Sequence, residues 1–472
     1  MDLRFLPHNT HLDSPEQFSQ LDPHLRQLGK QHLIHKSPLL DILPRNKPGI
    51  FTLSGGRQIG KTTLMKQWMA EQLLQGTPPE NIRFVTGELI EDHHALVRLF
   101  SDMLSAMPEA EHKYLILDEV TYIREWDKAV KYLADAGLLE RVGLFLTGSD
   151  MTLIKEARMR FPGRRGKESR VDFHLYPLNF LETVQLKENF SSSDIDTLVN
   201  EQAEPSLDLM DRLFREFECY LIHGGFLTAM NDLEEHGAIL PATYYTYTDW
   251  VRGDFLKRGR RENSLQEILR AIIKSYGSQV TWNSLTREMS IEHPKTVADH
   301  VSLLESMDVV FVLHALIEDK LAAAPKKARK VFFCDPFIFH CAMSWLWPCS
   351  NPYQDQSLPL LADSRKAGLL VESCAASLYG RNYPVYYIKA KGEVDIAYVH
   401  DGRFWPVEVK WTSQLRPGEL KQIVKYPNGL ILNKSRQRGS IQNIPTSPLP
   451  LELLRLGTHS QNGSITRFLK TY

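Results

Sequence analysis

The sequence predicts an α/β protein in which a parallel sheet, covered by helices on both faces, is followed by a second α/β segment near the C-terminus. Two observations support this fold class. Short apolar segments alternate with helical segments between residues 49 and 175, which is typical of buried parallel strands joined by helical crossovers. After residue 350, further apolar segments and a strong hairpin turn, Asp401-Gly402, predict another sheet.

The composition is that of a globular protein with several domains. A chain of 472 residues with 43% hydrophobic and 24% charged side chains can form about two to four domains. Its net charge of −1 gives no global basicity, so any contact with DNA must come from local patches. The five cysteines form no CxxC pair, which argues against a zinc cage or a disulfide framework and suits a reducing cytosol.

The hydrophobic pattern also predicts the cellular location of the protein. Residues 1–21 contain no apolar run of the kind that a secretory signal needs. No apolar run in the chain approaches the length of a membrane span. We therefore expect a cytoplasmic protein without a membrane partner.

The first 176 residues are expected to form one α/β core. Its helices are predicted at residues 62–74 and 126–136. Its strands are predicted at residues 49–54, 82–86, 114–117, 143–147 and 171–175. Residues 177–260 then turn mostly helical and are interpreted as a helical lid, with a polar loop near residues 190–194.

Residues 261–350 have the outline of a winged helix. Apolar side chains at i, i+3, i+4, i+7, i+8 and i+11 from Leu265 indicate the first helix. A short second helix is expected around Leu285, and a third follows over residues 297–307, opened by Pro294. Apolar segments 309–316 and 330–333 would form a β-wing. The basic turn between them, residues 325–330, is either a phosphate-contacting wing or a solubilising loop.

Residues 351–472 are expected to form a separate α/β domain. Helices are predicted at residues 369–378 and 417–426. Strands are predicted at residues 385–388, 394–399, 404–411 and 429–432.

A phosphate-binding loop is the strongest functional pattern in the chain. Residues 55–62 fit G-x-x-x-x-G-K-[ST] and lie between a predicted strand and a predicted helix. The glycines allow backbone N–H groups and the helix N-terminus to face phosphates. Lys61 is expected to neutralise the β and γ phosphates of ATP, and the Thr62 hydroxyl to hold Mg²⁺. The expected nucleotide-binding residues of this loop are Gly55, Gly56, Gly60, Lys61, Thr62 and Thr63.

The other half of the site is predicted at the end of strand 114–117. Four apolar residues bury this strand and place Asp118 and Glu119 at its carboxyl end, where open α/β sheets bind ligands. Asp118 is expected to contact Mg²⁺ through water, and Glu119 to polarise the attacking water as a general base. The alternative is a glycine-rich turn and an ordinary acidic strand end, which the joint occurrence of both patterns disfavours.

Three further residues are candidates for sensing or stabilising the γ-phosphate. Ser149 follows another buried strand, at a position where P-loop ATPases place a polar sensor. Arg164 and Arg165 are candidates for an arginine finger, because arginine spreads positive charge over a developing phosphoryl anion. A finger that acts in trans needs a homo-oligomer. The alternative is a solvated basic loop.

A second group of ionisable residues is predicted in the C-terminal segment. Strand alternation places Glu408 and Lys410 on one face of their strand, and Asp395 on the partner strand can point toward the same pocket. Glu372 lies on the preceding helix. A surface hairpin with scattered charges is the alternative.

The motifs together resemble prokaryotic AAA-type ATPases that carry a C-terminal domain of PD-(D/E)xK nuclease type, and the resemblance covers most of the chain. The relatives usually have Gly-Gly-aromatic-Pro in the lid, with the proline near adenine. Here Gly224-Gly225-Phe226-Leu227 lacks that proline, so the chain departs from the pattern at the expected base contact. The segments that resemble this family are residues 57–64, 117–120 with Trp126, 146–149, 162–166, 176–180 and Asp335-Pro336.

The C-terminal resemblance is closest to Holliday-junction-resolvase-like nucleases, and it implies a metal site. It implies that Asp395, Glu408 and the Val409 carbonyl bind Mg²⁺, and that Lys410 orients or deprotonates the attacking water. Glu372 would complete the metal shell. Gln422 occupies a position where relatives often place a polar active-site residue, and plain helix surface is the alternative.

The sequence favours an ATP-binding and hydrolysing protein that couples ATP turnover to DNA binding or to metal-dependent DNA cleavage. The DNA contacts would come from the winged helix and the C-terminal domain. A nucleotide-operated switch or scaffold, whose nuclease-like domain only binds a partner, stays open because the net charge is near zero and the lid proline is missing. A nucleotide or small-molecule kinase is disfavoured by the winged helix and by the length of chain beyond the core.

Overall fold

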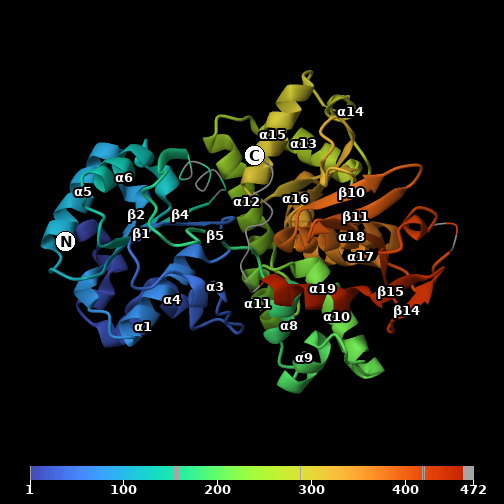
Figure 1. Ribbon diagram of the computed structural model, residues 1–472, viewed down its shortest axis with the longest axis horizontal. Coiled ribbons are helices and arrows are strands. Elements are labelled where there is room, and N and C mark those ends of the chain that lie inside the picture. Colours follow the sequence, from blue (N-terminus) through green and yellow to red (C-terminus); the bar gives the residue numbers. More distant parts are fainter. Residues whose placement is uncertain are drawn as a thin grey trace. The chain divides into compact units, whose positions relative to one another are not determined.

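The computed structural model describes residues 2–149, 151, 155, 157, 159–287, 289–416, 418 and 420–460 (Figure 1). The chain divides into two compact units, Met1–Tyr176 and Pro177–Tyr472. The segment expected as the α/β core lies in the first unit. The segments expected as lid, winged helix and nuclease-like domain all belong to the second unit.

The first unit is built on a five-stranded parallel sheet. Its strand order is β2-β3-β4-β1-β5, so β4 lies between β1 and β3. The strands are β1 (Gly49–Ser54), β2 (Ile82–Thr86), β3 (Lys113–Asp118), β4 (Val142–Gly148) and β5 (Asp172–His174). The helices are α1 (Phe18–Leu21), α2 (Pro23–Leu28), α3 (Leu39–Ile42), α4 (Lys61–Leu74), α5 (His93–Ala106) and α6 (Trp126–Asp135).

Helices cover both faces of this sheet, as the sequence predicts. Leu115 and Leu117 of β3 pack in one apolar cluster with residues of α5 and α6. Tyr114 and Ile116, which alternate with them, pack in a second cluster with α1, α2, α3 and α4. Because successive side chains of a strand point to opposite faces, a continuously apolar strand signals burial on both sides.

The N-terminal segment packs on the same unit through short helices that were not expected from the sequence. Three short 3-10 helices precede α1, at Leu3–His8, Thr10–Leu12 and Pro15–Gln17. The fully buried Lys66 ammonium of α4 lies 3.0 Å from Asp22 Oδ2 and donates a hydrogen bond of 2.5 Å to the His8 carbonyl. This buried pair fastens the N-terminal segment to the helix that follows the phosphate-binding loop.

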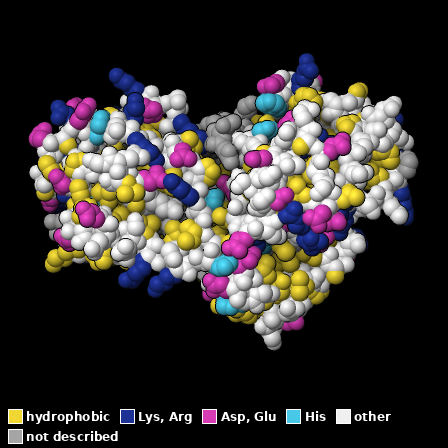
Figure 2. Space-filling model, turned by 90° about the horizontal axis from the view of Figure 1, so that it is seen from below, with side chains coloured by type: hydrophobic (Ala, Val, Ile, Leu, Met, Phe, Trp, Pro, Cys, Tyr) yellow, Lys and Arg dark blue, Asp and Glu magenta, His cyan; other side chains and the backbone are white. Residues whose placement is uncertain are grey.

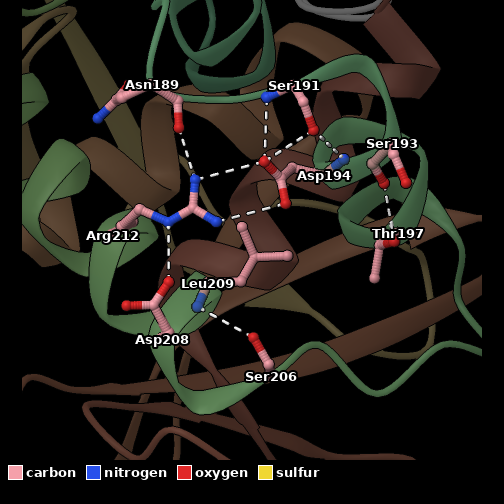
Figure 3. Close-up of polar contacts among 9 residues, drawn as sticks. All are labelled: Asn189, Ser191, Ser193, Asp194, Thr197, Ser206, Asp208, Leu209 and Arg212. Atoms are coloured by element: carbon pink, nitrogen blue, oxygen red, sulfur yellow. Dashed lines mark hydrogen bonds and ion pairs between the residues drawn. The ribbon is translucent and has the colours of Figure 1, made fainter.

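The second unit begins with helices that include the expected lid. The first five are α8 (Phe180–Gln185), α9 (Ser192–Val199), α10 (Leu207–His223), α11 (Leu227–His236) and α12 (Pro241–Lys257). Figure 3 shows how α9 and α10 are joined: Arg212 of α10 donates to the Asn189 carbonyl at 2.5 Å and to Asp194 at 3.3 Å. Ser191 caps α9 through the Asp194 backbone N–H, so the polar loop expected near residues 190–194 is in part the start of this helix.

The glycine pair of the expected lid lies against Asp335. Gly225 donates its backbone N–H to Asp335 Oδ2 at 3.0 Å, and a Cβ at Gly224 would lie 1.6 Å from Asp335 Oδ1. A Cβ at Gly225 would lie 2.1 Å from the Leu178 carbonyl oxygen. Only glycine fits at both positions, because backbone and carboxylate approach too closely for any side chain.

Three helices and a β-ribbon occupy the segment expected as a winged helix. The helices are α13 (Glu262–Lys274), α14 (Trp282–Thr286) and α15 (Pro294–Ser306). The antiparallel strands β6 (Val310–His314) and β9 (Arg329–Phe333) form the ribbon, and β7 (Leu316–Ile317) pairs with β8 (Ala322–Ala323) at its tip. The ribbon contacts the C-terminal sheet, since Ala315 bridges to Tyr387 and the Tyr387 hydroxyl donates to the Ala328 carbonyl at 2.6 Å.

The C-terminal part of the second unit contains a six-stranded mixed sheet of order β10-β11-β12-β13-β15-β14 (Figure 1). Its strands are β10 (Val385–Lys389), β11 (Glu393–His400), β12 (Arg403–Lys410), β13 (Leu430–Asn433), β14 (Gly439–Ile441) and β15 (Ile444–Pro448). The accompanying helices are α16 (Pro336–Leu346), η7 (Tyr353–Ser357), α17 (Leu358–Ala362), α18 (Ser364–Asn382) and α19 (Leu449–Ser460). The sequence analysis did not predict β14, β15 and α19.

The helix predicted at residues 417–426 is wrong for the part that the structure describes. Residues 420–426 contain only the 3-10 turn Ile423–Lys425, and Tyr426 is extended. A following proline, Pro427, disfavours helical backbone at Tyr426, because its ring collides with the preceding residue.

The surface carries charges of both signs. On the face shown in Figure 2, Lys and Arg side chains are interspersed with Asp and Glu on each unit, which agrees with the net charge of −1. Among the described residues, no helix is both long enough and apolar enough to cross a membrane.

Candidate nucleotide site and carboxylate cluster

The phosphate-binding loop joins β1 to α4 in the first unit. Residues 55–60, which include Gly55 and Gly56, follow the carboxyl end of β1, and α4 begins at Lys61. Gly60 has φ of 96°, a left-handed conformation that strongly favours glycine. Thr62 and Thr63 therefore lie in the first turn of α4, where free backbone N–H groups favour an anion.

Lys61, Thr62 and the β3 carboxylates lie together. The Thr62 hydroxyl donates to Asp118 Oδ2 at 2.7 Å. The buried Lys61 ammonium donates to the Gly56 carbonyl at 2.9 Å and lies 3.5 Å from Glu119 Oε1. The structure thus brings the predicted halves of the site into contact across β1 and β3.

Thr147 of β4 contacts both Asp118 and Glu119. Its hydroxyl donates to Asp118 Oδ1 at 2.5 Å and accepts the Glu119 backbone N–H at 3.0 Å. Glu119 has a left-handed φ of 51°, and its Oε2 is buried without a hydrogen-bond partner within the described residues. The sequence analysis chose Ser149 as the polar residue after this strand. Ser149 is buried at the end of β4, whereas Thr147 makes the contacts.

These residues fit a Mg²⁺–nucleotide. The loop and helix N-terminus suit phosphates, and Lys61 supplies a cation beside them. Thr62 and Asp118 supply the hard oxygen atoms that Mg²⁺ prefers. The unpartnered Glu119 Oε2 supplies an acceptor for a proton from water.

Arg165 is a correction to the predicted arginine finger. Its guanidinium is buried under its own sheet, where it lies 2.5 Å from Asp172 Oδ1 and donates to the Ile50 and Val171 carbonyls at 3.3 and 3.2 Å. A guanidinium held by these contacts is not available to a neighbouring molecule. Arg164 lies nearer the surface and pairs with Asp135 at 2.5 Å, which raises the pKa of its guanidinium.

In the second unit, Asp395 and Glu408 face each other across two antiparallel strands. The paired residues of β11 and β12 end at Ile396 and Val407, and Asp395 and Glu408 are the next residues on the two strands. The Val409 backbone N–H donates to Asp395 Oδ2 at 2.9 Å instead of continuing the strand ladder. Lys410 Nζ lies 2.6 Å from Glu408 Oε1 and 3.9 Å from Asp395 Oδ2. The strand alternation therefore placed these three side chains together correctly.

The cluster contains two residues that the sequence analysis did not assign to it. Lys330 of β9 lies 2.6 Å from Glu372 Oε1 and 3.9 Å from Asp395 Oδ1, and it contacts Glu393 Oε1. Glu393 could have been found, because it precedes Asp395 by two positions on the same strand face. No sequence pattern indicated that Lys330 belongs to this cluster. It was assigned to the basic turn 325–330, but only 1% of it is exposed.

Burial and mutual repulsion raise the pKa of two carboxyls in this cluster. Burial and the neighbouring Asp395 raise the pKa of Glu372 to about 7, against the attraction of Lys330. Burial and Asp395 raise the pKa of Glu408 to about 8, against the attraction of Lys410. Burial lowers the pKa of the Lys410 ammonium, but Asp395 and Glu408 outweigh it and raise that pKa overall.

The carboxylate cluster fits a divalent cation. Glu372, Glu393 and Asp395 each offer an oxygen within 4.8 Å of the others. Glu408 is 4% exposed, and its Oε2 has no hydrogen-bond partner in the part of the chain that the structure describes. When all four carboxyls are ionised, they exceed the two lysine ammonium groups by two charges, and one divalent cation would balance these charges in place of the protons that the raised pKa values of Glu372 and Glu408 favour. Gln422 accepts the backbone N–H of Gly392, the residue before Glu393, at 3.2 Å.

The sheet order, the loop and the paired carboxylates of the first unit define a P-loop ATPase domain. Residues 47–184 match the family model of an AAA domain, so this domain is of the AAA type. Residues 214–347 match the model of a domain of unknown function (DUF8612), which spans parts of the expected lid and winged helix.

The chain is also similar to individual proteins. An uncharacterized protein of Haemophilus influenzae is 26% identical over 271 residues, which are 54% of this chain and 60% of that relative. The chain thus covers less than two thirds of the relative's length. Among solved structures, the Aeropyrum pernix ORC1 protein in complex with DNA is 13% identical and matches over 71% of this chain and 96% of that one, with a TM-score of 0.31. The Thermotoga maritima RuvB Holliday junction branch migration motor is 16% identical and matches over 56% and 81%, with a TM-score of 0.26.

Proposed function

We propose that this protein hydrolyses ATP in its first unit and uses the turnover to control a metal-dependent reaction on DNA in its second unit. The observation that carries the ATPase is the contact of Thr62 and Lys61 with the two β3 carboxylates. The DNA-directed part rests on the carboxylate cluster with Lys410 beside it.

In the ATPase site, the residues have the following roles. Lys61 binds the β and γ phosphates, and Thr62 and Asp118 hold Mg²⁺. Glu119 takes the proton from the attacking water. Thr147 orients Glu119 through the backbone N–H bond and holds Asp118 through its hydroxyl. Arg164, acting from a second copy of the chain, would add positive charge at the γ-phosphate.

In the carboxylate cluster, Asp395, Glu408 and Glu372 would hold Mg²⁺ or Mn²⁺, which offsets the charge that develops on a phosphodiester. Lys410 would hold the attacking water next to Glu408. The α13–α15 segment and the exposed Lys326 and Lys327 of the ribbon turn would contact the DNA backbone.

A second candidate is a nucleotide-operated switch whose C-terminal sheet only binds a partner. Lys330 favours it, because this buried ammonium already pairs with Glu372 and Glu393. If the Lys330 ammonium fills the site, no metal ion is needed to balance those carboxylates. Such a domain would not cleave DNA.

One experiment separates the two functions. The full chain is incubated with ATP and Mg²⁺ or Mn²⁺, and phosphate release and cleavage of linear, circular and branched DNA are followed together. We expect Lys61→Ala to lose phosphate release, and Asp395→Asn to lose cleavage while it keeps phosphate release. Cleavage that persists in Asp395→Asn protein would contradict the assigned metal site. ATP hydrolysis without cleavage of any DNA would favour the switch.

A further inference from the structure

Lys330 is buried in an unusual way. Only 1% of it is exposed, and lysine is almost never fully buried unless it is paired. Lys326 and Lys327, in the turn just before it, are exposed. The ribbon therefore directs one of its lysines inward, and that lysine ends among the carboxylates of the C-terminal sheet.

The Lys330 ammonium contacts two of the three carboxylates proposed to hold the metal ion, Glu372 and Asp395, and also Glu393 beside them. It lies 2.6 Å from Glu372 Oε1 and 3.9 Å from Asp395 Oδ1, and it contacts Glu393 Oε1. The oxygen atoms that these three residues offer lie within 4.8 Å of one another, so one cation can occupy the space between them. An ammonium and a divalent cation cannot both do so, because their charges repel at that separation.

The cluster is nevertheless incomplete with its lysines alone. Glu408 Oε2 stays buried without a hydrogen-bond partner among the residues that the structure describes. A buried carboxylate oxygen without a partner is costly, so a further cation or donor at this point would be stabilising. This observation is independent of Lys330, because the other oxygen of Glu408 is bound by Lys410.

Contacts of the ribbon hold Lys330 in place. The Tyr387 hydroxyl donates to the Ala328 carbonyl at 2.6 Å, two residues before Lys330. Val280 and Arg329 exchange two backbone hydrogen bonds of 2.7 and 2.9 Å. Gln279, next to Val280, donates to Glu393. If the ribbon moved away from the C-terminal sheet, it would withdraw the ammonium from the carboxylates.

We propose that Lys330 is a tethered cation that keeps the carboxylate cluster closed to divalent metal while the ribbon is docked. Displacement of the ribbon, by DNA bound to its exposed lysines, then admits the metal. The proposal rests on the proposed metal site and adds its control. The ribbon then has a second role besides DNA contact. Its displacement by bound DNA would open the carboxylate cluster to the metal ion.

Manganese affinity tests the proposal without any cleavage assay. Mn²⁺ binding to the full chain is measured by electron paramagnetic resonance in the absence of nucleotide, for the unaltered chain, Lys330→Met and Lys326→Met. Methionine keeps an unbranched side chain, which ends one atom short of the lysine nitrogen, and it removes the charge. We expect Lys330→Met to bind Mn²⁺ at least about tenfold more tightly, which is about 1.4 kcal/mol. Lys326→Met, an exposed lysine of the same turn, should bind like the unaltered chain.

Two further variants make each result decisive. Asp395→Asn, added to Lys330→Met, should abolish the tight site, and Mn²⁺ binding that survives it would contradict the proposed metal site itself. If Asp395→Asn abolishes binding but Lys330→Met binds no more tightly than the unaltered chain, the closing role of Lys330 is wrong. Should Lys330→Met fail to fold, Tyr387→Phe loosens the ribbon while keeping Lys330. It should also tighten Mn²⁺ binding, and an unchanged affinity would overturn the proposal.

Discussion

Replacing Thr147 by valine tests whether β4 positions the catalytic carboxylates. Valine keeps the shape of threonine and removes its hydroxyl. The change leaves Asp118 Oδ1 without the donor at 2.5 Å and the Glu119 N–H without the acceptor at 3.0 Å. Because Thr147 is fully buried, water cannot readily replace either bond.

The size of the effect follows from these two bonds. A hydrogen bond to a charged group contributes about 1.5–3 kcal/mol and a neutral one about 0.5–1.5 kcal/mol. Part of this loss would appear in folding stability, and part in the orientation of Glu119 in the transition state. A loss of about 1.4–2.7 kcal/mol in the transition state corresponds to about a 10- to 100-fold fall in kcat.

The assay is steady-state phosphate release from ATP, with nucleotide affinity and thermal unfolding measured on the same protein. Thr52→Val is the matched control. Thr52 is equally buried, lies on the neighbouring strand β1, and donates to Asp172 Oδ1 at 2.6 Å outside the nucleotide site. We expect both variants to be less stable and only Thr147→Val to lose turnover, with Thr147→Ser close to the unaltered protein. Equal kcat values for the two valine variants would refute the role of Thr147.

Other predictions address the remaining assignments. Glu119→Gln should still bind ATP but hydrolyse it about 10²–10⁴-fold more slowly, because the amide cannot take a proton; undiminished phosphate release would end the assignment. Arg165→Ala should cost about 3–5 kcal/mol of unfolding free energy by chemical denaturation, since it leaves Asp172 buried without its ion-pair partner. Arg164→Ala should leave stability nearly unchanged and slow only hydrolysis by oligomeric protein. The pKa of Glu408 is raised from 4.5 to about 8 in the folded chain. Between pH 4.5 and about pH 8, the folded chain therefore binds more protons than the unfolded chain. Stability should therefore fall as the pH rises through this window, by up to about 1.4 kcal/mol per pH unit, and a flat profile for the unaltered chain would contradict the burial of Glu408.

The elements of both sheets were largely predictable because their signals are local. The predicted strands of the parallel sheet agree with β1 to β5 within about two residues, since most of them are short, mainly apolar segments between helical ones. The exceptions have weaker local signals. The helix expected at residues 417–426 is reduced in its described part to the 3-10 turn Ile423–Lys425, for which Pro427 accounts only at Tyr426, and β14 and β15 are short strands of mixed polarity without an alternating pattern.

The sequence by itself determined the nucleotide site, because a contiguous loop and the end of one strand contain nearly all of its groups. Strand alternation also placed Asp395, Glu408 and Lys410 together. Only the tertiary structure decided which basic residues are available to other molecules. Lys330 and Arg165 belong to basic runs that look solvent-exposed, yet both are buried against carboxylates of other segments. Burial depends on which distant strands meet, and no local pattern records it, so a lysine expected to contact DNA became the cation inside the candidate metal site.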